Sequence, residues 1–199
     1  MKRKGLFCCA VLVSALVIHA CAHAPDGQTE SKQVELESFM PLAVGNQWIY
    51  ATQFQGQDQP DLTVSIVRQE NGVFIDNRPQ PSRMRFDGHG LRDGNVRYLL
   101  KAPLEKGNKW MSVADVKTVE RYEIIDTQRT VRTASGTFEG CVTVRMEVRI
   151  TQDKVMRNDM TFAPSVGMVE VKTSLLVGSK LLPQSLMLLK QHDLKTKGS

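Results

Sequence analysis

A strict alternation of apolar and polar residues between positions 142 and 151 is the strongest pattern in this chain. Val142, Val144, Met146, Val148 and Ile150 alternate with Thr143, Arg145, Glu147, Arg149 and Thr151. Successive side chains of a strand point to opposite faces of a sheet, so this pattern predicts a strand with one face on a core and the other in water. Residues 62–67, 116–125 and 168–176 also have strand-like sequences.

Turn sequences separate the predicted strands. The dipeptides Asn71-Gly72, Asp93-Gly94 and Ser135-Gly136 each lie between two strand-like segments. Asn-Gly and Asp-Gly favour two-residue hairpin turns, because both central residues of such a turn need positive φ. No helical period of apolar residues is found beyond the N-terminal region. We therefore predict a mainly β fold with an antiparallel sheet of about ten strands.

The first 21 residues have a different pattern, typical of export. Three basic residues, Lys2 to Lys4, precede an apolar run from Leu6 to Ile18 that only Ser14 interrupts. This run is shorter than the ~20 residues of a spanning helix and fits a signal peptide. Residues 18–21, Ile-His-Ala-Cys, resemble the lipobox of bacterial lipoproteins. That resemblance implies removal of residues 1–20 and acylation of the Cys21 thiol.

Secretion without a lipid is the alternative interpretation. Residues 22–24, Ala-His-Ala, form a second small-x-small cleavage site, although the proline at position 25 disfavours cleavage there. Residue 22 is not the aspartate that retains lipoproteins in the inner membrane, so a lipidated chain is expected in the outer membrane, facing the periplasm. The alternative localisation is that of a secreted or soluble periplasmic protein.

The predicted domain organisation follows from these segments. Residues 1–20 are the signal peptide, and residues 21–38 are the lipidated cysteine and a flexible polar tether. Residues 39–194 form a single antiparallel β domain, and residues 195–199 are a frayed tail. The first 20 residues include three basic and no acidic residues, so 23 Lys and Arg remain against 21 Asp and Glu. This near balance gives no reason to expect nucleic acid as a partner.

One octapeptide occurs twice with five identical positions. Residues 41–48 are Pro-Leu-Ala-Val-Gly-Asn-Gln-Trp, and residues 103–110 are Pro-Leu-Glu-Lys-Gly-Asn-Lys-Trp. Each copy predicts a turn at Gly-Asn followed by a strand that begins with the tryptophan. Trp48 and Trp110 are thus expected as core aromatics, with a ligand groove as the alternative place for both.

Four further segments lie in the order found in a known group of proteins. They are residues 39–50, which contain P-L-x-x-G-N-x-W, residues 99–110, residues 135–144 with G-T-F-x-x-C-x-x-V, and residues 162–169 with F-A-P-x-V-G-x-V. Together they resemble an uncharacterised family of bacterial lipoproteins and periplasmic proteins. The resemblance covers most of the predicted domain. It implies a strongly curved antiparallel sheet or a half-open β-barrel, and it implies no established activity.

Signatures of catalysis and of metal binding are missing from the sequence. It contains no H-E-x-x-H, paired C-x-x-C, G-x-S-x-G or phosphate-loop motif. We therefore expect no enzymatic activity, no cofactor and no metal site. Cys141, the one cysteine after residue 21, is interpreted as a small buried hydrophobe.

The first functional hypothesis is a membrane-anchored lipoprotein with a non-catalytic structural or interaction role in the cell envelope. Its partners would be the membrane, through the N-terminal lipid, and an envelope protein or an apolar ligand. The alternative is a periplasmic binding module that holds an acyl chain or other apolar ligand in a concave β face. Eight methionines follow residue 21, and their flexible thioethers suit either core gaps or such a face.

Overall fold

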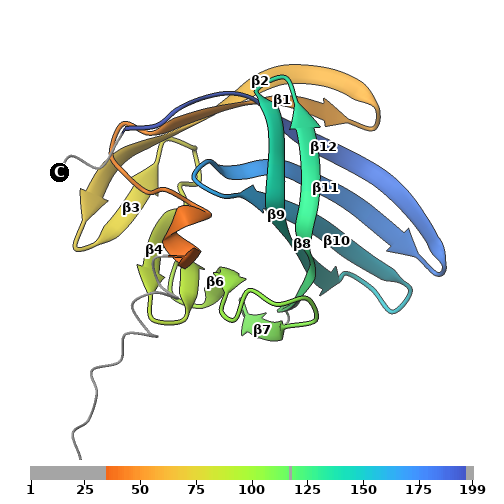
Figure 1. Ribbon diagram of the computed structural model, residues 1–199. Coiled ribbons are helices and arrows are strands. Elements are labelled where there is room, and N and C mark those ends of the chain that lie inside the picture. Colours follow the sequence, from red (N-terminus) through yellow and green to blue (C-terminus); the bar gives the residue numbers. More distant parts are fainter. Residues whose placement is uncertain (1–34, 117, 196–199) are drawn as a thin grey trace, which may run out of the picture.

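The computed structural model describes residues 35–116 and 118–195. These residues form one twelve-stranded antiparallel sheet (Figure 1). The strands are β1 Gln47–Phe54, β2 Gln57–Glu70, β3 Val73–Asp76, β4 Arg83–Asp87, β5 Gly90–Asp93, β6 Arg97–Lys101, β7 Lys109–Val113, β8 Val119–Thr133, β9 Gly136–Arg149, β10 Lys154–Ala163, β11 Gly167–Val177 and β12 Lys180–Asp193.

The sheet is a meander that curves until its first and last strands meet. Its order is β6-β5-β4-β3-β2-β1-β12-β11-β10-β9-β8-β7, so β1 pairs with β12 and every other pair is consecutive in the chain. The two sheet edges are β6 and β7, which are also consecutive, and we call the gap between them the seam. The result is an antiparallel barrel that is nearly closed and open along the seam.

The predicted mainly β fold with a curved antiparallel sheet is confirmed, with twelve strands rather than about ten. The difference comes from the short strands β3 to β7, which have only four or five residues each. Alternation over so few residues gives a weak signal in the sequence. The Asn71-Gly72 turn joins β2 to β3 as predicted, with φ of 49° and 77° at the two residues.

The end of the predicted tether is part of the fold. Residues 35–38 are helical, and the Leu36 side chain is only 2% exposed. The backbone N–H of Ser165, in the β10–β11 connection, donates to the carbonyl of Ser38 at 2.7 Å. The folded region therefore begins by residue 35, not at residue 39, because apolar side chains of this segment cover one end of the barrel. At the other terminus, Lys195 N donates to Asn46 Oδ1 at 2.8 Å, so the first residue of the predicted tail is also held.

The two copies of the octapeptide adopt the same turn. In each copy the glycine has φ near 90°, 93° at Gly45 and 92° at Gly107. Asn46 Nδ2 donates to the carbonyl of Pro41 at 2.8 Å, and Asn108 Nδ2 donates to that of Pro103 at the same distance.

The strand after each turn also forms matching pairs. The backbone of the first turn exchanges hydrogen bonds with Ile66 on β2, and that of the second with Ile124 on β8. Trp48 pairs with Val64, two residues before Ile66, and Trp110 pairs with Tyr122, two residues before Ile124. The sequence repeat is thus also a structural repeat. Each copy begins a strand pair, β1–β2 or β7–β8, and the two pairs have the same register.

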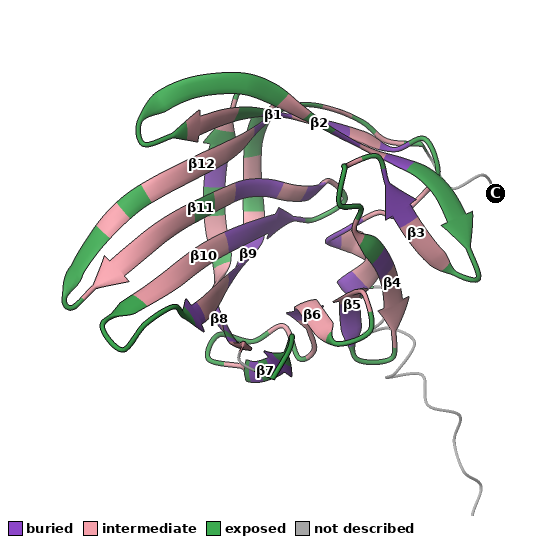
Figure 2. Ribbon diagram, turned by 180° about the vertical axis from the view of Figure 1, so that it is seen from behind, coloured by how far each residue is buried: buried purple, intermediate pink, exposed green. Residues whose placement is uncertain are grey.

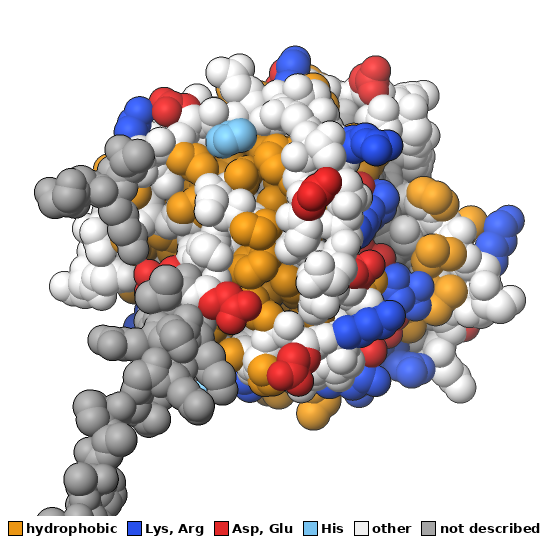
Figure 3. Space-filling model, viewed as in Figure 1, with side chains coloured by type: hydrophobic (Ala, Val, Ile, Leu, Met, Phe, Trp, Pro, Cys, Tyr) orange, Lys and Arg blue, Asp and Glu red, His pale blue; other side chains and the backbone are white. Residues whose placement is uncertain are grey.

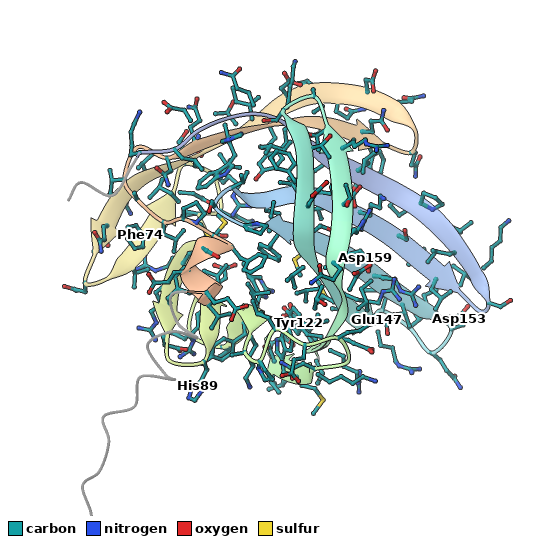
Figure 4. All side chains as sticks on the ribbon, viewed as in Figure 1. Phe74, His89, Tyr122, Glu147, Asp153 and Asp159 are labelled. Atoms are coloured by element: carbon teal, nitrogen blue, oxygen red, sulfur yellow. The ribbon has the colours of Figure 1, made fainter. Side chains whose placement is uncertain are left out.

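Charged side chains cover the outer face of β9 and β10 in cross-strand ion pairs. Arg145 contacts Asp159 at 2.8 Å, and Arg157 contacts Glu147 at 2.7 Å. Figure 3 shows acidic and basic side chains intermingled on the right of this face, and Figure 4 shows Glu147 and Asp159 there. Arg145 and Glu147 are polar positions of the alternating segment at residues 142–151. Burial on β10 and β11 is concentrated at the end where these two strands join, at residues 160–163 and 167–170, whereas the β9–β10 and β11–β12 turns are exposed (Figure 2).

Candidate functional site

The concave face of the sheet encloses an apolar cavity of about 300 Å³, which we call the inner cavity. Its wall includes Trp48, Tyr50, Val64, Met84, Met160 and Met187. These residues come from β1, β2, β4, β10 and β12. Met40, from the segment that follows the helix, and Met168 on β11 also line it. The cavity is therefore built from strands on nearly all sides of the barrel.

A second cavity of about 700 Å³ adjoins the inner cavity, and we call it the rim cavity. Its wall includes Leu99, Tyr122, Met146, Val148, Met156 and Ile150. Leu99, Asn158 and Met160 line both cavities, so the two share one wall. Ile150 is 54% exposed, which places the mouth of the rim cavity near the β9–β10 turn.

Strand register explains why these residues share a face. Met160 on β10 pairs with Val171 on β11, which pairs with Met187 on β12. Paired residues lie on the same side of a sheet, so all three face the inner cavity. Their neighbours Asp159 and Lys172 lie on the opposite, outer face. The alternation in sequence thus separates an apolar lining from a charged exterior.

A chain of polar side chains forms one wall of the cavities. Arg78 is paired with the buried Asp76 at 2.6 Å and also donates to Ser82. Ser82 Oγ donates to Asp93 Oδ2 at 3.3 Å, and Arg97 Nη1 lies 3.6 Å from the same oxygen.

The chain continues across the seam from β6 to β8. Arg97 Nε donates to Glu120 Oε2 at 2.8 Å, and its Nη2 donates to Glu120 Oε1. Tyr122 Oη donates to Glu120 Oε2 at 2.6 Å. Figure 4 shows Tyr122 near the lower end of β8, while His89 lies apart, on the β4–β5 turn. Arg97 thus joins the edge strand β6 to β8, the neighbour of the other edge strand β7, through side chains where backbone pairing is missing.

The environment of Glu120 decides its protonation. Burial of its carboxyl tends to raise its pKa, but the hydrogen bonds from Arg97 and Tyr122 outweigh burial and hold the pKa below its ordinary value. Burial and the hydrogen bond to Glu120 raise the pKa of Tyr122 far above its ordinary value. At neutral pH the cluster is therefore an ionised carboxylate held by a guanidinium and a phenol.

The two tryptophans have different relations to the cavities. Trp48 is fully buried, lines the inner cavity, and donates its indole N–H to the carbonyl of Val166 at 2.7 Å. Trp110 is 6% exposed, stacks on Tyr122 with ring centroids 5.3 Å apart, and donates to the carbonyl of Tyr98 across the seam at 3.0 Å. Trp48 is thus part of the cavity wall, whereas Trp110 supports the wall from behind Tyr122.

Sequence reasoning did not single out Asn158, Arg97 or Glu120. A signal for two of them exists in the alternation. Asn158 lies between Met156 and Met160 on the face of β10 that otherwise holds apolar residues. Glu120 likewise precedes Tyr122 on the inward face of β8. A polar residue on the inward face of an amphipathic strand indicates that this part of the barrel interior is not packed with apolar side chains alone.

The other predicted site residue, Cys21, lies outside the described residues. Cys141 is fully buried, and burial raises the pKa of its thiol to about 11. Within residues 35–116 and 118–195, no group of three or more His, Cys, Asp or Glu side chains could hold a metal ion. The same part of the chain has no helix of sufficient length and hydrophobicity to span a membrane.

Comparison with known proteins adds structural likenesses only. No family model and no curated protein matches the sequence. A candidate lipoprotein from Parabacteroides distasonis has a TM-score of 0.45 and 14% identity, covering 78% of this chain and 98% of its own. A candidate exported protein with a YmcC-like fold from Bacteroides fragilis has a TM-score of 0.42 and 14% identity, covering 77% and 98%. The hypothetical lipoprotein YmcC from Escherichia coli has a TM-score of 0.37 and 12% identity, covering 82% and 92%.

Proposed function

We propose that this protein binds an acyl chain, or an apolar ligand of similar shape, in the concave face of its barrel. The observation that carries the proposal is the distribution of methionine. Seven of the eight methionines after residue 21 line the two cavities, namely Met40, Met84, Met146, Met156, Met160, Met168 and Met187. The exception is Met111, which is 68% exposed on β7.

Methionine suits a wall that must fit a flexible chain. Its side chain is unbranched and polarizable, so it can adjust to an irregular apolar ligand at little cost. The volumes of the cavities, about 300 and 700 Å³, fall within the ~300–1,000 Å³ of typical ligand pockets. A barrel with a purely structural role would be expected to fill this space with side chains. The cavities therefore support the binding hypothesis over the structural role that we expected first.

Binding without catalysis is the second part of the proposal. Both carboxylate oxygens of Glu120 already accept hydrogen bonds from Arg97, and one of them also accepts from Tyr122. A carboxylate held in this way is a weak candidate for a general base, because proton uptake would break these bonds. The cluster is better suited to holding the seam together than to acting on a ligand.

The cell envelope is the proposed place of action, on the basis of the N-terminal sequence. The basic start, the short apolar run and the lipobox-like residues before Cys21 support export and acylation. We propose an anchor in the outer membrane, facing the periplasm. The polar residues between Cys21 and residue 35 would then join the lipid to the barrel.

The test uses the chain from residue 21 with Cys21→Ser and the neutral fluorescent probe N-phenyl-1-naphthylamine. The probe should bind saturably with a micromolar Kd. Val171→Trp should fill the inner cavity and weaken binding at least 10-fold, because Val171 lines that cavity. The matched control is Val67→Trp on β2, where Val67 is 47% exposed and lines neither cavity, and it should bind as the parent does. The absence of saturable binding by the parent chain would contradict the proposal.

A further inference from the structure

Polar groups inside the cavities differ in whether the protein satisfies them. Tyr50 Oη donates to the carbonyl of Met168 at 3.0 Å, and Tyr122 and Arg97 are bound to Glu120. Among the described residues, the side chains of Asn158 and Thr173 form no hydrogen bond, although both line the inner cavity. Both side chains are half-buried, so water can reach them in the free protein, and a ligand that displaces this water should replace its hydrogen bonds.

Asn158 and Thr173 form one uncharged polar pair on the β10–β11 side of the inner cavity, apart from the charged wall. They are directly paired across β10 and β11, so their side chains lie on the same face. Asn158 lines both cavities, which puts the spot where the two adjoin. An amide and a hydroxyl side by side offer both donors and acceptors, and neither carries a charge.

The charged wall disfavours an anionic ligand. Arg78 and Arg97 line the cavities together with the carboxylates of Asp93 and Glu120, and Asp76, which lines neither cavity, is paired with Arg78. Each guanidinium is within ion-pair distance of at least one of these carboxylates, so no cation of this wall is left for a ligand carboxylate.

One further arginine, at the mouth, does not change this conclusion. Arg149 lines the rim cavity but is exposed, and its Nη1 donates to the carbonyl of Gln152 at 3.1 Å. A buried carboxylate without a cationic partner is costly to desolvate.

We infer that the ligand is an acyl chain attached through an uncharged linkage, an ester or an amide, which Asn158 and Thr173 recognise. The Asn158 amide N–H would donate to the acyl carbonyl, and the Thr173 hydroxyl would bind the linking oxygen or nitrogen. The hydrocarbon would lie along the methionines on either side. This inference rests on the proposed function, and it adds the chemical class of the ligand.

The experiment compares ligands with one chain length and different head groups. Lauroylglycerol, N-lauroylethanolamine and laurate each displace N-phenyl-1-naphthylamine from the residue 21–199 chain at pH 8, where laurate is ionised. At least one of the two neutral ligands should displace the probe about 10-fold more effectively than laurate, and their order identifies the linkage. Equal or better displacement by laurate would overturn the inference.

Two near-isosteric variants test the residues themselves. Asn158→Leu and Thr173→Val should each weaken displacement by the preferred neutral ligand by about 3- to 10-fold, which corresponds to the loss of one hydrogen bond. Binding of the probe alone should stay unchanged, which shows that the cavity is intact. Asn95→Leu, in the exposed β5–β6 turn, is the control and should change neither quantity. Unchanged displacement in both cavity variants would overturn the inference while probe binding still supports the proposed function.

Discussion

Glu120→Gln tests whether side chains close the seam between the two sheet edges. The Glu120 side chain is 4% exposed, and it accepts hydrogen bonds from Arg97 on β6 and from Tyr122 on its own strand. Glutamine has nearly the same shape but only one acceptor oxygen, and its NH₂ group would face a donor of Arg97. The substitution therefore removes the charge and one acceptor without opening a hole in the packing.

The expected loss of stability follows from the burial of the two partners. Breaking a fully buried ion pair costs about 3–5 kcal/mol, because the remaining charge stays desolvated. Here the Arg97 side chain is 38% exposed and keeps Asp93 at 3.6 Å, so water and Asp93 compensate part of this cost. We expect a decrease of about 2–3 kcal/mol in the free energy of unfolding. For a domain of this size, that corresponds to a decrease in Tm of roughly 5–10 °C.

The assay is urea unfolding at pH 7, with Glu123→Gln as the matched control on the same strand. Glu123 is 40% exposed and lies 3.5 Å from Lys109, itself 68% exposed, so its removal should cost no more than about 0.5 kcal/mol. Equal effects of the two substitutions would refute the idea that the Arg97–Glu120 pair holds the seam.

A pH series gives an independent check of the same pair. The pKa of Glu120 is lower in the folded protein than its ordinary value, so its ionised form stabilises the fold at neutral pH. That contribution is fully present above the ordinary pKa of about 4.3 and is lost as the pH falls through the folded pKa. The stability difference between the parent and Glu120→Gln should therefore stay constant above pH ~5 and shrink below pH ~4.

Two further predictions concern the anchor and the repeated turn. Mass spectrometry of the mature N-terminus should find an acylated Cys21, and Cys21→Ser should move the protein out of the membrane fraction; an unmodified start at residue 25 or later would contradict acylation. Asn46→Ala should cost about 2–4 kcal/mol in urea unfolding, since Asn46 is fully buried and bonds both Pro41 and Lys195. Asn108→Ala should cost about 1 kcal/mol, because Asn108 also has two bonds, to Lys101 and Pro103, but is half-exposed. Equal costs at the two asparagines would show that burial does not set the difference.

The features of the fold that depend on residues close together in the sequence could be predicted. The alternation at residues 142–151 fixed which face of β9 is apolar, and the Asn71-Gly72 turn required positive φ that few other pairs adopt. The octapeptide repeat predicted two similar turns, which the structure contains. The helix at residues 35–38 was not predicted, because four residues are too few to give a helical period in the sequence.

The candidate site could be predicted less well, because it depends on pairs distant in sequence. Nothing local indicates that β1 pairs with β12, yet that pairing curves the sheet and places Met187 opposite Thr52. Arg97 and Glu120 are 23 residues apart and meet only because the seam leaves β6 beside β8. The sequence did contain a weak sign of the site in Asn158, a polar residue at an inward position between two methionines.

The sequence by itself predicted an export signal and determined the β class, the turn chemistry and the apolar face of β9. These properties depend on side-chain type and on the two-residue period of a strand, so they need no partner to be recognised. Only the tertiary structure decided that seven methionines line the two cavities, although Met40, Met84 and Met160 are also buried in the core, and that Asn158 pairs with Thr173 in the cavity wall. The volume that the concave face encloses depends on the nearly closed barrel, and the barrel depends on the pairing of β1 with β12, two strands far apart in the chain.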